Sequence, residues 1–88
     1  MDEAPLPRFA VTTGLPVSEG GRKPAVRLLV HLVEQAAASP CDEKRSGSGT
    51  LVLTIGAEDE AEAEESVRVA LRVLHLSDTP ILSVERQE

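Results

Sequence analysis

The chain has 88 residues, of which 41% are hydrophobic and only one, Phe9, is aromatic, and its 15 acidic and 9 basic residues give a formal charge of −6. This length has room for one core, which buries only about 60% of the surface that the unfolded chain exposes. The negative charge and the shortage of rings for base stacking oppose direct nucleic-acid binding, so we expect no such partner.

The single cysteine and the N-terminal residues indicate where in the cell the protein is expected. Cys41 is the single cysteine, so no disulfide can form within the chain, and an unpaired thiol fits a reducing compartment. No long apolar run is present, and the sequence begins Met1-Asp2-Glu3 without a basic or apolar targeting stretch. We therefore expect no membrane association and a cytoplasmic protein, with the nucleus reachable by diffusion.

A strand and a helix are predicted in the first half of the chain. Residues 8–13 predict a strand, because Phe9, Val11 and Thr13 alternate with Ala10 and Thr12. A helix is expected to begin at Pro24, since proline suits the first helical turn. Its buried face is predicted from residues that recur at helical spacing: Val26, Leu29, Val33 and Ala37. We expect one domain over residues 8–86, preceded by a flexible N-terminus at residues 1–7.

The middle of the chain changes from polar to apolar. Residues 39–49 are rich in Ser, Pro, Gly and charged side chains, which favours an exposed loop. Residues 50–55 then give the clearest strand pattern. Its two faces are formed by alternating residues: Leu51, Leu53 and Ile55 on one side, and Val52 and Thr54 on the other.

A second helix and a last strand follow. The acidic run at residues 58–65 predicts a helix start, because negative side chains favour the positive end of the helix dipole. The helix is expected to end near Leu76 or Ser77. Its main apolar stripe contains five residues: Ala63, Val67, Ala70, Leu71 and Leu74. In the last strand, residues 81–86, alternation predicts that Leu82 and Val84 share one apolar face.

Helices between successive strands favour crossover connections and parallel pairing. The sequence therefore predicts an α/β fold, a small two-layer sandwich in the order strand, helix, strand, helix, strand. Its three-stranded, mostly parallel sheet would carry both helices on one face. The other face would present small or weakly polar side chains: Ala10, Thr12, Val52, Thr54 and Ser83.

The second helix also has an extra apolar stripe of Val69, Val73 and Leu76, which is more than a helix on one sheet face needs. The stripe could pack against the first helix, or it could bind another protein chain in a homo- or hetero-oligomer. Candidate interface residues come from the stripe, its flanks and the exposed sheet face: Val69, Val73, Leu76, Arg68, Arg72, Val52 and Thr54. The leading hypothesis is a non-catalytic interaction module, a small subunit or an accessory or assembly factor of a larger complex.

Chemistry-bearing motifs are sparse. His31 and His75 lie on polar helix stripes without a cysteine or second histidine at metal-ligand spacing, and no serine has a nucleophile-elbow motif. We therefore assign no catalytic residue, no metal site and no cofactor, and we lean against an enzyme. The loop at residues 14–23 superficially resembles a phosphate-binding loop, but Gly21 is followed by Arg22-Lys23-Pro24 rather than by a lysine and a hydroxyl residue. Anion binding by Arg22 and Lys23 is the alternative to a plain flexible loop.

Residues 49–85, which contain GTLVLTIGA…ALRVLHLSDTPILSVE, resemble the N-terminal half of crotonase-fold (enoyl-CoA hydratase-like) proteins. In that family a V-V-L-T-G strand precedes a helix and then a P-x-I-A-x-V strand. The catalytic motifs of the family are absent, because Gly56 leads directly into the acidic helix start, so no catalytic residue is carried over. The resemblance implies an alternative function: binding of a small anionic ligand or an acyl-CoA, or a reduced crotonase-like enzyme.

Overall fold

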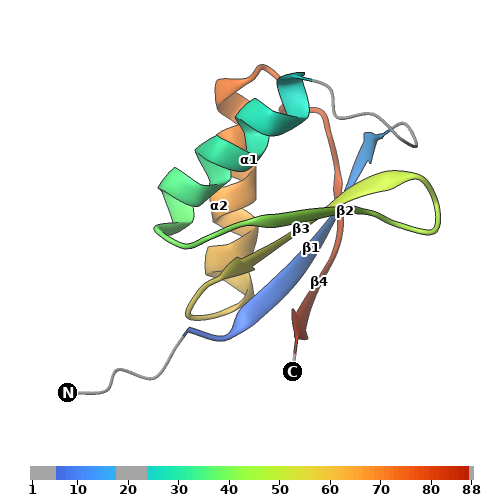
Figure 1. The fold of residues 1–88 in the computed structure, drawn as a ribbon. Helices are drawn as coiled ribbons and strands as arrows, with labels where there is room; N and C mark the ends of the chain where they lie inside the picture. Colours follow the sequence, from blue (N-terminus) through green and yellow to red (C-terminus); the bar gives the residue numbers. More distant parts are fainter. Residues whose placement is uncertain (1–5, 18–23, 88) are drawn as a thin grey trace.

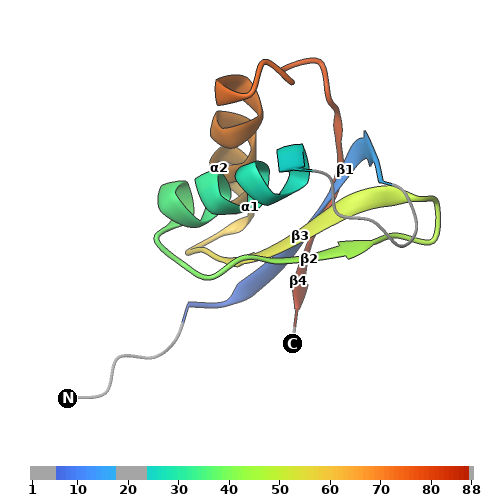
Figure 2. The ribbon, with the colours of Figure 1, turned by 45° about the horizontal axis from the view of Figure 1, so that its top comes forward.

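The computed structural model describes residues 6–17 and 24–87, which form two helices and a four-stranded sheet (Figure 1). The elements in chain order are β1 (Arg8–Pro16), α1 (Pro24–Ala37), β2 (Asp42–Arg45), β3 (Thr50–Gly56), α2 (Glu60–Val73) and β4 (Ile81–Gln87). The strand order is β2-β3-β1-β4, and all three neighbouring pairs are antiparallel. Both helices cover the same face of the sheet (Figure 2). This connectivity is that of the ferredoxin-like βαββαβ arrangement.

The predicted three-stranded, mostly parallel sheet was wrong. The segment expected to be an exposed loop contains β2, which pairs with β3 as an antiparallel hairpin and so reverses the direction of the chain. Each helix still joins two strands that run the same way, but a third strand lies between them: β3 separates β1 from β2, and β1 separates β3 from β4. Because β2 consists of four consecutive charged residues, it has no apolar alternation from which to predict a strand.

The core lies between the sheet and the helix layer, and it is aliphatic except for Cys41 and Phe9, which are 8% and 3% exposed. The predicted buried face of α1, from Val26 to Ala37, is confirmed. Thr13 is the largest polar side chain within this layer and is fully buried. Its hydroxyl donates to the Leu51 carbonyl oxygen at 2.9 Å and accepts from the Leu15 amide at 3.3 Å, so burial leaves its hydrogen bonds satisfied.

Helix α2 is capped at both ends. The Asp59 side chain accepts from the Glu62 amide at 2.8 Å, as expected of an N-cap. At the other end His75 takes a left-handed conformation with φ of 60°, and the Leu76 amide donates to the Leu71 carbonyl oxygen at 2.8 Å. This is a Schellman cap, so the helix ends at Val73 and Leu76 lies beyond it.

A β-bulge changes the faces of β4. Thr12 pairs with Ser83 and Thr13 pairs with Ile81, which leaves Leu82 as the extra residue. Ile81 and Val84 pack against the core, whereas Leu82 is 58% exposed. The predicted common face of Leu82 and Val84 was therefore wrong, because the bulge shifts the alternation by one residue.

Candidate protein-interaction surface

The residues of the expected extra stripe on α2 do not form one surface. Val73 is 57% exposed and Val69 is half-buried, but Leu76 belongs to the helix cap and packs partly against the core. Arg68 and Arg72 line a hollow with Leu71, Ser77 and Thr79, on the side of the connection to β4. Helical spacing turns Val69 and Val73 about 100° away from Arg68 and Arg72, respectively, so the four side chains do not form one continuous stripe.

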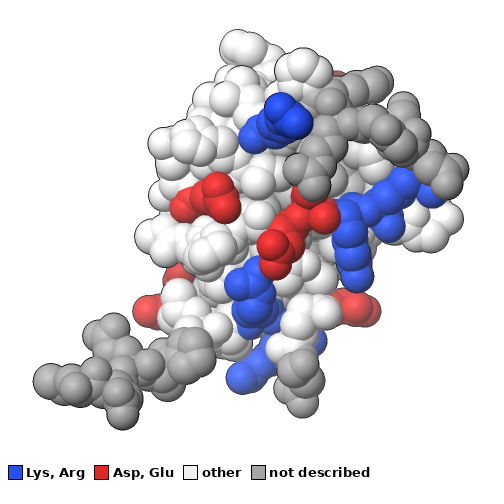
Figure 3. All heavy atoms as spheres, in the orientation of Figure 1, with Lys and Arg blue, Asp and Glu red and all other residues white. Residues whose placement is uncertain are grey.

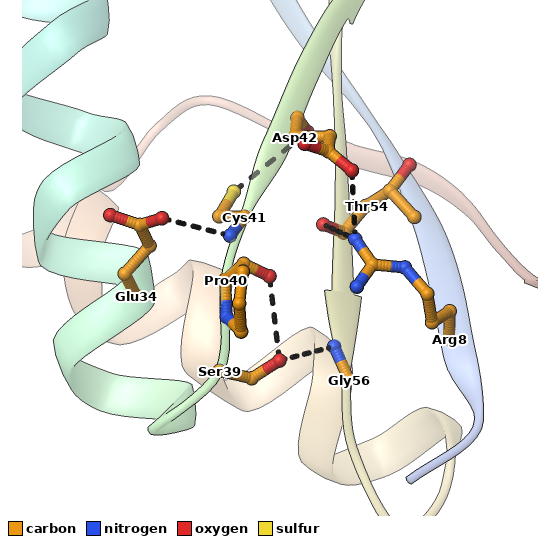
Figure 4. A network of polar contacts seen from close by, with 8 residues as sticks. All are labelled: Arg8, Glu34, Ser39, Pro40, Cys41, Asp42, Thr54 and Gly56. Carbon is orange, nitrogen blue, oxygen red and sulfur yellow. Dashed lines mark hydrogen bonds and ion pairs between the residues drawn. The ribbon is translucent and has the colours of Figure 1, made fainter. Parts of the chain in front are cut away.

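The sheet face without helices is partly covered by a charged side chain of its own. Val52 is only 5% exposed and Thr54 is half-buried, although neither belongs to the core cluster between sheet and helices. Arg8 reaches across β3, and its Nη2 donates to Asp42 Oδ2 at 3.0 Å and to the Thr54 carbonyl oxygen at 3.2 Å (Figure 4). Val52 and Thr54 therefore present little free apolar area.

The β2 edge is tied to the rest of the domain by a polar network (Figure 4). The Glu34 carboxylate of α1 accepts from the Cys41 amide at 3.0 Å. The Ser39 hydroxyl accepts from the Gly56 amide at 3.1 Å and donates to the Pro40 carbonyl oxygen at 3.4 Å. Acidic and basic side chains intermix on the surface around β2 (Figure 3). A short, charged strand of this kind discourages pairing with another chain.

Cys41 is a structural rather than a reactive thiol. It is 8% exposed and borders a hollow that is also lined by Arg27, Val30, Asp42 and Glu43. Burial raises the pKa of the thiol to about 12, and the negative charges of Glu34, Asp42 and Glu43 add to this effect, which Arg8 opposes. The thiol is therefore protonated at neutral pH and is a poor nucleophile.

The β4 edge is longer than the β2 edge and is not wholly charged. β4 is seven residues long and stands last in the sheet, with Leu82, Ser83 and Glu85 to Gln87 exposed. Its pairing with β1 uses the backbone groups on one side, and among the described residues no strand lies on its other side. The exposure of Leu82 was not predicted from the sequence. Strict alternation was assumed for residues 81–86, and no residue in this segment indicates the bulge.

The structure adds no support for a site at the other predicted residues. Arg22 and Lys23, the candidate anion ligands, lie outside the described residues. His31 is exposed and its Nε2 lies 3.2 Å from Gln35 Nε2. Within residues 6–17 and 24–87, no three His, Cys, Asp or Glu side chains gather where they could hold a metal ion, and no helix there is long and apolar enough to cross a membrane.

In comparisons with known proteins, no family model matches the chain and no curated protein is significantly similar to it. The crotonase-like pattern of residues 49–85 thus stays a prediction. The β4 edge and the flank of α2 beside it are the surface on which a functional hypothesis can be built.

Proposed function

We propose that this chain is a non-catalytic protein–protein interaction module, a small subunit or assembly factor of a larger complex, with β4 as its docking edge. The observation that carries the proposal is the 58% exposure of Leu82 on a seven-residue strand that ends the sheet. An edge strand offers a row of backbone donors and acceptors, and a partner strand extends the sheet by pairing with them.

Two energetic terms support docking at β4. Full burial of a leucine side chain stabilises by about 1.5–3 kcal/mol, and covering the exposed part of Leu82 would contribute roughly half of that. A domain of 88 residues with a largely aliphatic core is also marginally stable by itself, so association would add to its stability by mass action.

Affinity capture with matched surface variants tests the proposal. Leu82→Arg places a charge on the docking edge, whereas Leu28→Arg does the same on α1, at a leucine that is 48% exposed. Quantitative mass spectrometry should find a protein that the unmodified chain and Leu28→Arg recover equally and that Leu82→Arg recovers about tenfold less, the effect of about 1.4 kcal/mol.

Two results would count against the proposal. One is equal recovery of every partner by Leu82→Arg and the unmodified chain. The other is a stable monomer in light scattering that recovers no protein at all above background. Circular dichroism of both variants verifies that any loss of binding does not come from unfolding.

A further inference from the structure

Given the docking role proposed for β4, the charges beside this strand define the chemistry of its partner. Arg68 and Arg72 of α2 share a hollow with Ser77 and Thr79 in the connection to β4. The Arg72 side chain makes no hydrogen bond or ion pair within the described part of the chain. Arg68 binds Glu64 Oε2 through its Nε at 2.8 Å, which leaves the other guanidinium nitrogens available.

These two arginines lie at one end of the docking edge. A short connection joins α2 to β4, so the two elements run in opposite directions and the C-terminal end of α2 lies over the start of β4 (Figure 1). A strand added to β4 would therefore pass the arginines where it meets Ile81 and Leu82. Backbone pairing, an apolar contact and two cations would meet within this one part of the edge.

We propose that the segment that pairs with β4 is an extended, acidic stretch of another protein, with an apolar side chain against Leu82 and a carboxylate against Arg68 and Arg72. The planar guanidinium group matches a carboxylate in two-point hydrogen bonding. Pairs of this kind at an exposed rim contribute modest affinity, but they fix the register of the added strand and raise its rate of association.

A second copy of the chain fits this edge less well. Antiparallel self-pairing of β4 centred on Val84 would place Arg86 of the second copy opposite Leu82. That cation would then approach Arg68 and Arg72, so like charges would oppose each other. An acidic segment from a different protein places opposite charges at the same position.

Two synthetic nine-residue peptides test the inference by fluorescence anisotropy with the full chain. Both alternate Val and Thr, and two positions carry Asp in one peptide and Lys in the other. We expect the Asp peptide to bind about fivefold more tightly, the upper end for exposed charge pairs. Arg72→Glu should abolish this preference, whereas Arg27→Glu, at an exposed arginine of α1 distant from β4, should retain it.

The outcomes separate the partner chemistry from the docking role of β4. Equal binding of both peptides, lost in Leu82→Arg, would overturn the acidic partner but leave docking at β4 in place. Binding that Leu82→Arg does not weaken, or no binding of either peptide, would overturn both. A dimer in sedimentation equilibrium that Leu82→Arg dissociates would identify a second copy as the occupant and overturn the acidic partner.

Discussion

Strands β2 and β4 form the two edges of one sheet. Both have features that discourage pairing with another chain, since β2 is short and wholly charged and β4 has a bulge and the exposed charges of Glu85 and Arg86, but the two edges differ in length and in apolar exposure. β2 has four residues, all charged; Cys41, just before it, bonds to Glu34 of α1, and Asp42 bonds to Arg8 of β1. β4 has seven residues and an exposed leucine, and the sheet ends there. This contrast supports our proposal that β4, rather than β2, pairs with a partner strand.

The largest effect that we predict concerns the thiol beside the β2 edge. With a pKa raised from 9.0 to about 12, the thiolate fraction of Cys41 at pH 8 is about 1000-fold lower than in the unfolded chain, from the difference of 3 pH units. Labelling by iodoacetamide should thus be slow in the folded protein and fast in urea. Glu34→Gln removes a nearby negative charge and should speed the labelling. Fast labelling of the folded protein would show that the β2 edge opens readily.

The same pKa predicts how stability depends on pH. Because the folded state raises the pKa, the folded chain retains a proton that the unfolded chain loses above pH 9. The stabilisation is complete below about pH 9 and is lost as the pH rises toward 12. Urea titrations between pH 8 and 11 should show that the unfolding free energy falls more steeply with pH for the unmodified protein than for Cys41→Ser. Parallel pH dependences would contradict the raised pKa of Cys41.

Two glycines, one near each edge, should differ in their tolerance of alanine. A Cβ on Gly14 would lie 2.7 Å from Pro80 Cγ, a rigid ring that is held by the hydrogen bond from the Gly14 amide to the Pro80 carbonyl oxygen. We expect Gly14→Ala to lower the free energy of unfolding by about 2 kcal/mol. On Gly56 the Cβ would lie 2.8 Å from Ser39 Oγ, which can rotate away at the cost of one hydrogen bond, about 1 kcal/mol.

Urea unfolding at pH 7 measures both glycine effects. Ser39→Ala provides the control, because it removes the oxygen that the new methyl group meets and should make Gly56→Ala nearly neutral in that background. A larger loss of unfolding free energy in Gly56→Ala than in Gly14→Ala would contradict this account. It would mean that the backbone around Pro80 shifts more easily than the Ser39 side chain.

The helix ends that precede the two edge strands offer stabilising substitutions. His75 and Ala38 have positive φ values of 60° and 52°, and a non-glycine residue in that region is strained by about 1 kcal/mol. His75→Gly and Ala38→Gly should each raise the unfolding free energy by up to about 0.5 kcal/mol, because the greater entropy of unfolded glycine offsets at least half of the relieved strain. A decrease in Tm for either variant in thermal unfolding would contradict this reading of the caps.

The smallest predicted effects come from exposed charges and side chains at the edges themselves. Asp42→Asn breaks the ion pair with Arg8, in which the Asp42 side chain is 81% exposed, and should cost no more than about 0.5 kcal/mol. Leu82→Arg should change the unfolding free energy by a similarly small amount, because Leu82 is mostly outside the core. Only Leu82→Arg should reduce partner binding. A loss of binding in Asp42→Asn would contradict docking at β4 and point to β2 instead.

Much of the local structure could be predicted from the sequence, whereas the sheet topology could not. The start of α1 at Pro24 follows from the preference of proline for the first helical turn, whereas the buried face of α1 and the strand from Thr50 follow from apolar spacing, and the structure confirms all three. The strand Asp42–Arg45 could not be predicted, because its pairing with β3 comes from tertiary contacts rather than from its own residues. That one omission changed the predicted sheet from antiparallel to parallel.

The candidate surface was predicted only in part. Arg68 and Arg72 were named from helical spacing, and the structure places them beside the connection to β4. Leu82 was assigned to an apolar face, because a bulge depends on the register with β1 and leaves no mark in the sequence of β4. Val52 was expected on an open sheet face, but its side chain is only 5% exposed.

The most direct test is a ¹⁵N NMR titration of the full chain with the acidic peptide, read separately at the two edges. Docking at β4 predicts shifted resonances and slower amide exchange at Ile81–Gln87, with the resonances of Asp42–Arg45 unchanged. Changes centred on β2, or on the exposed Leu28 and Val73 of the helix layer, would contradict the assignment of β4 as the docking edge.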